Sequence, residues 1–230
     1  MQLQFLSHSC IKLIHADVCL LIDPFLTHNP IAPVTWQEAA RGVTHIVLTH
    51  GHGDHVGDTP AIAKANNIPV VAMVELARWL EKQGVEKTVQ VNFGTSELQD
   101  TKTPVSISLV PAWHTSTAND GTYLGNPAGL VITMGGHTVY HAGDTGLFGD
   151  MALINEYYQP DVVLLPIGGG YTMDAKTAAF AANKYFAGAK HIIPLHYATF
   201  PALAPNATEF QSLCKNLAVN AMKPAETLTL

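Results

Sequence analysis

The sequence contains no apolar run long enough to cross a membrane, and only 13% of its 230 residues are charged. A membrane-spanning helix needs about 20 consecutive apolar residues, whereas the longest apolar stretches, at residues 19–22 and 162–166, have the length of strands. Residues 1–15 alternate between apolar and polar side chains and lack the basic stretch and apolar block of a signal peptide. We therefore expect a cytoplasmic protein without membrane insertion.

Cysteine is also scarce. The three cysteines, Cys10, Cys19 and Cys214, are widely spaced and form no Cys-x-x-Cys pair. An odd number at such spacing argues against a disulfide framework and against a thiolate metal site. We expect ordinary, partly buried thiols at all three positions.

Basic residues are few as well, with 12 Lys and Arg against 18 Asp and Glu and a formal net charge of −6. Because no cluster of Lys or Arg is present, binding of DNA or RNA is disfavoured and a small-molecule substrate is favoured. Histidine, by contrast, is abundant: the 12 His equal Lys and Arg combined. A histidine surplus in a weakly charged chain suggests metal ligands.

The predicted elements form two similar halves, in each of which strands are followed by alternating helices and strands. The expected strands cover residues 3–6, 11–14, 18–22, 43–48, 68–72, 89–93, 105–110, 128–134, 138–141, 161–166, 191–194 and 226–230. The expected helices cover residues 36–41, 59–66, 74–83, 150–158, 174–186 and 206–217. Two such halves packed face to face predict an α+β sandwich of two mixed sheets with helices outside. No linker-like stretch separates them, so we expect one domain over residues 1–230.

Residues 49–58 read Thr-His-Gly-His-Gly-Asp-His-Val-Gly-Asp. Within six positions they hold four side chains of the metal-ligand type, which are His50, His52, Asp54 and His55. The intervening glycines permit positive φ angles, so neighbouring side chains can turn toward one point. Imidazole and carboxylate groups suit zinc and similar divalent ions. The alternative is a polar turn, with Asp58 as the cap of the helix expected from residue 59, but a mere turn would rarely gather so many ligand-type residues.

A two-metal site needs more ligands than this segment offers. Three residues lie where a predicted strand runs into a turn, which is where sites form on sheet-based folds. They are His114 in Pro-Ala-Trp-His-Thr-Ser, Asp144 in His-Ala-Gly-Asp-Thr-Gly and His196 in Pro-Leu-His-Tyr-Ala-Thr-Phe. Each histidine alone would more often be a non-ligand, so their order along the chain carries the prediction.

That ordered pattern, His-x-His-x-Asp-His followed by a single His, an Asp in a Gly-Asp-Thr setting and a final His, resembles the metallo-β-lactamase superfamily. The resemblance covers essentially the whole chain. Supporting motifs are Ser-His-Ser at 7–9, Ile-Asp-Pro at 22–24, Ala-Gly-Asp-Thr-Gly at 142–146, Pro-Ile-Gly-Gly-Gly-Tyr at 166–171 and His-Tyr-Ala-Thr-Phe at 196–200. They favour the small metal-dependent hydrolase branch, near L-ascorbate-6-phosphate lactonase and N-acyl-phosphatidylethanolamine phospholipase D. The fold implied is the αββα sandwich of that superfamily.

The resemblance also implies the roles of the ligands. His50, His52 and His114 would hold the first metal, and Asp54, His55 and His196 the second. Asp144 would bridge the two ions. Zn²⁺ is expected, with Mn²⁺ and Fe²⁺ as the alternatives. Two ions about 3.5–4 Å apart lower the pKa of a shared water and so provide a hydroxide, which Asp54 would also orient.

Five further residues are candidates for positions beside the ligands or the substrate. In the family, the residue corresponding to Asp23 holds the far ring nitrogen of a ligand histidine; the alternative is a turn residue. His8 either faces the pocket or is a solvated turn histidine. The other three follow sheet ends and are expected to line the pocket: Tyr171, Asp174 and Tyr197. For Asp174 the alternative is a helix cap.

The sequence therefore predicts a dinuclear metal-dependent hydrolase that acts on a small ester-like substrate, with lactones and phosphoesters ahead of amides. One alternative is an iron-dependent redox enzyme of the same fold, although that chemistry would not require His55. The other is a metal-binding protein without catalysis, which the complete ligand set disfavours. The sequence leaves open whether the chain forms a homo-oligomer.

Overall fold

The computed structural model describes residues 1–230 and contains two mixed β-sheets. The first sheet has the strand order β13-β1-β2-β3-β4-β5-β6 and the second β12-β11-β10-β9-β8-β7. The first comprises β1 (Gln2–Ser7), β2 (Cys10–His15), β3 (Val18–Ile22), β4 (His45–Val47), β5 (Val70–Met73), β6 (Thr88–Val91) and β13 (Thr227–Thr229). The second comprises β7 (Gly94–Glu97), β8 (Val105–Pro111), β9 (Ala128–Met134), β10 (His137–His141), β11 (Val162–Pro166) and β12 (His191–Leu195).

Each sheet is antiparallel in one part and parallel in the other. Strands β13, β1, β2 and β3 pair antiparallel, and β3 to β6 pair parallel. In the second sheet β7 to β10 are antiparallel and β10 to β12 are parallel. Parallel neighbours need a crossover connection, usually a helix, whereas antiparallel neighbours can be joined by a tight turn. The repeated order of strands and helices in the sequence thus produces two similar halves.

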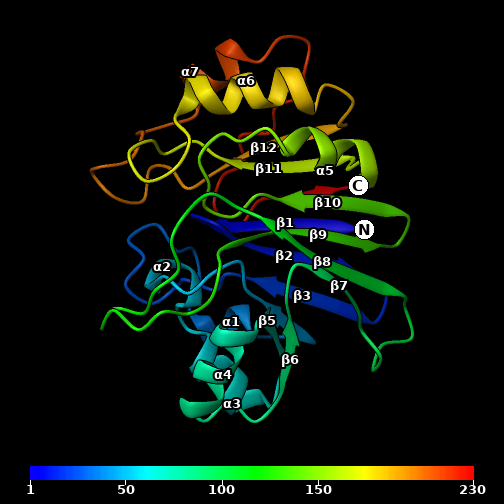
Figure 1. Ribbon diagram of the computed structural model, residues 1–230, viewed down its shortest axis with the longest axis vertical. Coiled ribbons are helices and arrows are strands. Elements are labelled where there is room, and N and C mark those ends of the chain that lie inside the picture. Colours follow the sequence, from blue (N-terminus) through cyan, green and yellow to red (C-terminus); the bar gives the residue numbers. More distant parts are fainter.

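Most of the helices lie toward the two outer sides of the strands, and the short helix at residues 53–56 lies nearer the middle (Figure 1). With the first half go α1 (Trp36–Ala39), α2 (Gly53–Val56), α3 (Thr59–Asn66) and α4 (Val74–Lys82). With the second half go α5 (Met151–Tyr158), α6 (Ala175–Tyr185) and α7 (Thr208–Leu213). In Figure 1, α6 and α7 stand at one end of the molecule and α3 and α4 at the other. None of these helices is long and apolar enough to span a membrane.

Strand β11 contributes side chains to two apolar clusters, one on each of its faces. Its side chains at 162 and 164 belong to a cluster of 46 buried residues that both sheets share. The alternate ones, Val163 and Leu165, belong to a second cluster of 20 residues that includes side chains of α5, α6 and α7. Successive side chains of a strand point to opposite faces, so a strand covered on both faces reads as a continuous apolar run.

The predicted α+β sandwich is confirmed, but several local predictions need correction. Residues 53–56 form the helical turn α2 inside the segment expected to be a loop. Strand β7 was not expected, because its sequence Gly-Thr-Ser-Glu is polar and mostly exposed. The last helix is shorter than predicted and ends at Leu213. Asp58 does not cap α3; its carboxylate accepts hydrogen bonds from the backbone N–H groups of Leu26 and Thr27 at 3.0 and 2.8 Å.

Candidate metal centre

The residues of the candidate site lie in segments that follow five strands. Asp23 follows β3, His50 and its neighbours follow β4, and three more segments follow β8, β10 and β12. The structure brings the side chains of all seven predicted ligands together, namely His50, His52, Asp54, His55, His114, Asp144 and His196. Helix α2 places Asp54 and His55 on one turn directly after the two histidines. Their role as metal ligands stays a prediction that the following distances support.

Three ring nitrogens form the first set. His52 Nδ1 lies 3.0 Å from His50 Nε2 and 3.2 Å from His114 Nε2. Zinc–nitrogen bonds of about 2.0–2.1 Å at tetrahedral angles separate two ligand atoms by about 3.4 Å. The three nitrogens are therefore spaced like ligands of a single ion, with His52 using Nδ1 and the other two using Nε2.

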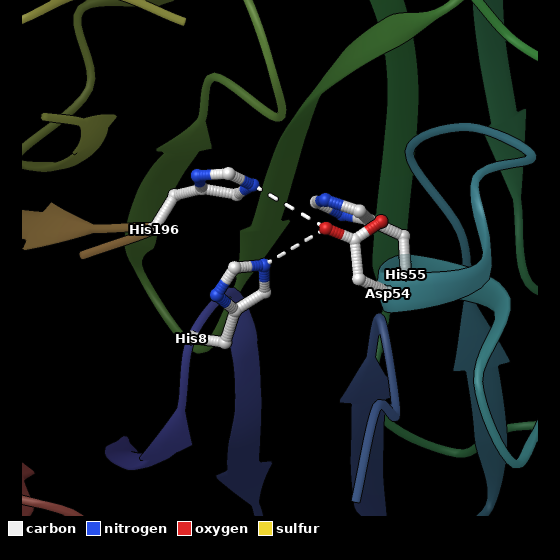
Figure 2. Close-up of side chains that lie close together, drawn as sticks. All are labelled: His8, Asp54, His55 and His196. Carbon is white, nitrogen blue, oxygen red and sulfur yellow. Dashed lines mark hydrogen bonds and ion pairs between the residues drawn. The ribbon is translucent and has the colours of Figure 1, made fainter. Parts of the chain in front are cut away.

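The second set consists of Asp54, His55 and His196, and His8 lies in the same cluster of ligand-type atoms (Figure 2). His196 Nε2 lies 3.6 Å from Asp54 Oδ2. Asp144 contacts members of both sets: its Oδ2 lies 3.0 Å from His196 Nε2 and 3.6 Å from His114 Nε2, and its Oδ1 lies 3.4 Å from His55 Nε2. One carboxylate thus lies between the two groups of ligand-type atoms.

Four buried atoms in this centre have no hydrogen-bond partner: His55 Nε2, Asp144 Oδ1 and both ring nitrogens of His196. Buried polar atoms are almost always hydrogen-bonded, because leaving one unpaired costs about 1–3 kcal/mol. A nitrogen lone pair and a carboxylate oxygen facing each other without a hydrogen bond are what a divalent cation would satisfy. The donor set therefore fits metal ions.

Asp23 holds His55 from behind. Its Oδ2 accepts a hydrogen bond from His55 Nδ1 at 2.7 Å, and its Oδ1 accepts one from the backbone N–H of Thr49 at 2.9 Å. Both side chains are fully buried. With Nδ1 donating to Asp23, Nε2 is the ring nitrogen of His55 that faces Asp144, as the family resemblance implies. The alternative of a solvated turn residue at position 23 is excluded by this burial.

Three residues of the site have left-handed backbone conformations. The φ angles of His8, Asp23 and His196 are 57°, 46° and 55°. This conformation costs an ordinary residue roughly 1–2 kcal/mol and is found mainly where the surrounding structure enforces it, often at functional sites. Gly168 is constrained in another way, because any Cβ there would collide with the carbonyl oxygen of His196.

The first set is neutral at pH 7. Burial lowers the pKa of His52 and His114, and it lowers the pKa of His50 well below its ordinary value. Neutral imidazole is the form that binds metal.

Carboxylates and histidines with raised pKa values face one another around the second set. Burial alone would raise the pKa of Asp144, but the facing His55 and His196 hold it well below its ordinary value. Burial likewise opposes protonation of His196, yet the charge of Asp144 raises its pKa to about 9. The carboxylates thus favour protonation of these histidines, and protons compete with metal ions for the ring nitrogens.

Two cavities open onto the centre, and His52, Asp54 and Phe200 line both. One has a volume of about 720 Å³ and extends past Phe25. The other has about 470 Å³ and extends past Tyr171. Neither cavity is lined by a lysine or an arginine.

The other predicted pocket residues lie elsewhere. Asp174 caps α6 by accepting a hydrogen bond from the Thr177 backbone N–H at 2.8 Å, so the helix-cap alternative holds. Tyr197 packs against the second apolar cluster and lines neither cavity. The sequence did not indicate His28 and Phe200 as cavity residues, although Phe200 belongs to the quoted motif at 196–200.

Known proteins resemble this chain in sequence and in fold. A family model described as the beta-lactamase superfamily domain matches residues 19–197. A metal-dependent hydrolase of Azorhizobium caulinodans is 42% identical over 233 residues, covering 97% of each chain. The chain belongs to this family of metal-dependent hydrolases in the metallo-β-lactamase superfamily.

Solved structures of the superfamily have the same fold as this chain. A metallo hydrolase from the archaeon Ignicoccus hospitalis matches with a TM-score of 0.88 and 34% identity, covering 99% of this chain and 97% of that one. A metallo-β-lactamase fold protein from Bacillus subtilis matches with a TM-score of 0.75 over 99% of this chain and 98% of its own, at 15% identity, which shows the shared fold alone. The family prediction from the ordered ligand pattern is thus confirmed.

Proposed function

We propose that this chain is a dinuclear metal-dependent hydrolase that cleaves a small ester-like bond. The observation that carries the proposal is the position of Asp144 between two sets of ligand-type atoms, within 3.6 Å of nitrogens from both. His50, His52 and His114 would hold one ion, and Asp54, His55 and His196 the other. Zn²⁺ fits the imidazole and carboxylate donors, and Mn²⁺ and Fe²⁺ are the alternatives.

Two bound divalent ions supply an activated water and polarise the scissile bond. Asp54 is the ligand best placed to handle that water. Its side chain is 29% exposed, whereas those of His55 and Asp144 are nearly inaccessible, and it lines both cavities. Burial opposes its ionisation, but hydrogen bonds with His196 and His8 lower the pKa of Asp54, so the carboxylate is ionised and can accept a hydrogen bond from water.

The cavities favour an uncharged substrate. Phe25 and Phe200 line the larger cavity, and Tyr171 and Leu203 line the smaller one. A phosphate or carboxylate outside the reacting bond would find no lysine or arginine there, and Arg and Lys are the usual partners of such groups. We therefore place lactones and neutral carboxylic esters ahead of phosphoesters.

The test is turnover by metal-free protein reloaded with Zn²⁺, Mn²⁺ or Fe²⁺. Uncharged lactones and aryl esters would be compared with aryl phosphodiesters, and metal content would be measured on the same samples. We expect lactone or ester hydrolysis that requires two ions per chain and is abolished in Asp54→Ala. Absence of hydrolysis with every ion and substrate class, or full activity with one ion, would contradict the proposal.

A further inference from the structure

His8 lies in the turn between β1 and β2 and is not among the seven predicted ligands. Its side chain is fully buried, and its Nε2 lies 3.2 Å from Asp54 Oδ2 (Figure 2). Phe25 and Phe200 pack edge-on against the imidazole, with ring centroids 5.8 and 5.6 Å away. Of the two readings that the sequence allowed, the solvated turn histidine is therefore excluded.

Hydrogen bonds determine how the His8 ring is oriented. A carboxylate only accepts, so Nε2 carries the hydrogen and donates it to Asp54. In a neutral ring Nδ1 is then an acceptor. The Thr199 hydroxyl can donate to this nitrogen at 2.8 Å or to the Tyr197 carbonyl oxygen at 3.2 Å, and the nitrogen is the nearer of the two. The hydroxyl and the carboxylate thus fix the ring from opposite sides.

The backbone of His8 reaches the other half of the molecule. Its carbonyl oxygen accepts a hydrogen bond from the backbone N–H of His196 at 3.0 Å. Asp54 comes from the first half, after β4, whereas His196 follows β12 of the second sheet. His8 therefore contacts, through its ring and its carbonyl, two members of the second metal set that arrive from different sheets.

We propose that His8 is a positioning residue that fixes the Asp54 carboxylate against His196 and so preforms the second metal position. The inference rests on the proposed dinuclear centre. A free aspartate side chain samples several rotamers, and ordering it costs free energy when the metal binds. The hydrogen bond from His8 holds one oxygen in place before binding, and loss of such partners typically weakens metal affinity about 10–100-fold.

The experiment compares His8→Ala, His8→Gln and Thr199→Val with the parent protein. Gln can place an amide N–H near the position of His8 Nε2, whereas Ala removes the donor; Thr199→Val leaves His8 in place but removes its anchor. His45→Ala is the matched control, because His45 is also buried and contacts a carboxylate, Asp100, at 3.0 Å, but lies outside the metal sets. Co²⁺ titrations followed by visible absorption, with chelator competition, give the affinity of each position.

We expect His8→Ala to weaken the second position about 10–100-fold while the first stays within about twofold. Thr199→Val should have a smaller effect in the same direction, His8→Gln should restore most of the affinity, and His45→Ala should match the parent. Parent-like Co²⁺ affinity and spectrum in both His8→Ala and Thr199→Val would overturn the inference, as would equal weakening of both positions. Because the readout is metal binding, failure of the proposed ester hydrolysis would leave this result independent.

Discussion

Thr49 donates its hydroxyl hydrogen to Asp23 Oδ2 across 2.6 Å, and the same hydroxyl oxygen lies 3.0 Å from His50 Nδ1. A hydroxyl has one hydrogen, and the carboxylate can only accept it, so the Thr49 oxygen must accept from His50 Nδ1. His50 Nε2 is then bare and faces His52. Since Asp23 also holds Nδ1 of His55, one buried carboxylate sets the tautomers of two histidines, one in each metal set.

Asp23→Ala should therefore weaken metal binding at both positions. We expect a loss of about 10–100-fold, because His55 loses the carboxylate that orients its ring and Thr49, which orients His50, loses its acceptor. Chelator competition with metal-sensitive dyes measures the two affinities. Asp100→Ala, which removes the exposed carboxylate beside His45, is the control and should bind metal like the parent. Unchanged affinity in Asp23→Ala would show that the ring orientations do not depend on this carboxylate.

Metal binding should release protons. The pKa of His196 is about 9, because the charge of Asp144 outweighs the effect of burial, so this ring is protonated in the metal-free protein at pH 7.5. It must lose that proton to act as a ligand, so affinity should rise with pH from 7 to 9. Calorimetry in two buffers of different ionisation enthalpy should detect release of at least about one proton per chain. A binding enthalpy that is independent of the buffer would rule out this coupling.

The His196–Asp144 pair should stabilise the metal-free protein less as the pH rises. Because the folded-state pKa of His196 is raised from 6.5 to about 9, its contribution is fully present below pH 6.5 and is lost as the pH rises through 9. The loss is on the order of 3 kcal/mol. Urea unfolding of chelator-treated protein at pH 6 and pH 9.5 measures this contribution as the difference between the parent and His196→Gln in the change of unfolding free energy. An equal change in the two proteins would argue against the His196–Asp144 pair.

The sequence predicted the architecture because strand periodicity and helix signals are local. Helix α3 has the predicted bounds, 59–66, and the closing strand β13 lies inside the predicted 226–230. Strand β7 was not predicted because its polar sequence shows no alternation of apolar and polar residues. It forms by antiparallel pairing with β8, a contact that its own sequence does not indicate. Helix α2 escaped because glycine-rich sequences read as loops.

The candidate ligands could be predicted because their order along the chain is distinctive. The threonines that support Asp23 and His8 could not be predicted, because their roles arise from contacts between distant segments. Thr199 contacts His8, which is 191 positions away in the sequence, and Thr49 contacts Asp23, which is 26 positions away. Nothing local distinguishes such threonines from those on any strand end. Asp174 illustrates the opposite case, since its capping role depends only on Thr177, three residues away.

The most direct test of the dinuclear centre is metal stoichiometry and ester turnover in Asp144→Ala beside the parent protein. Asp144 lies between the two sets of ligand-type atoms, while the core consists of apolar strands, so the variant should fold. We expect two ions per chain in the parent, and in the variant loss of most second-metal occupancy and of nearly all hydrolysis. Unchanged turnover with one bound ion in both proteins would contradict the bridging role of Asp144 and the two-metal mechanism.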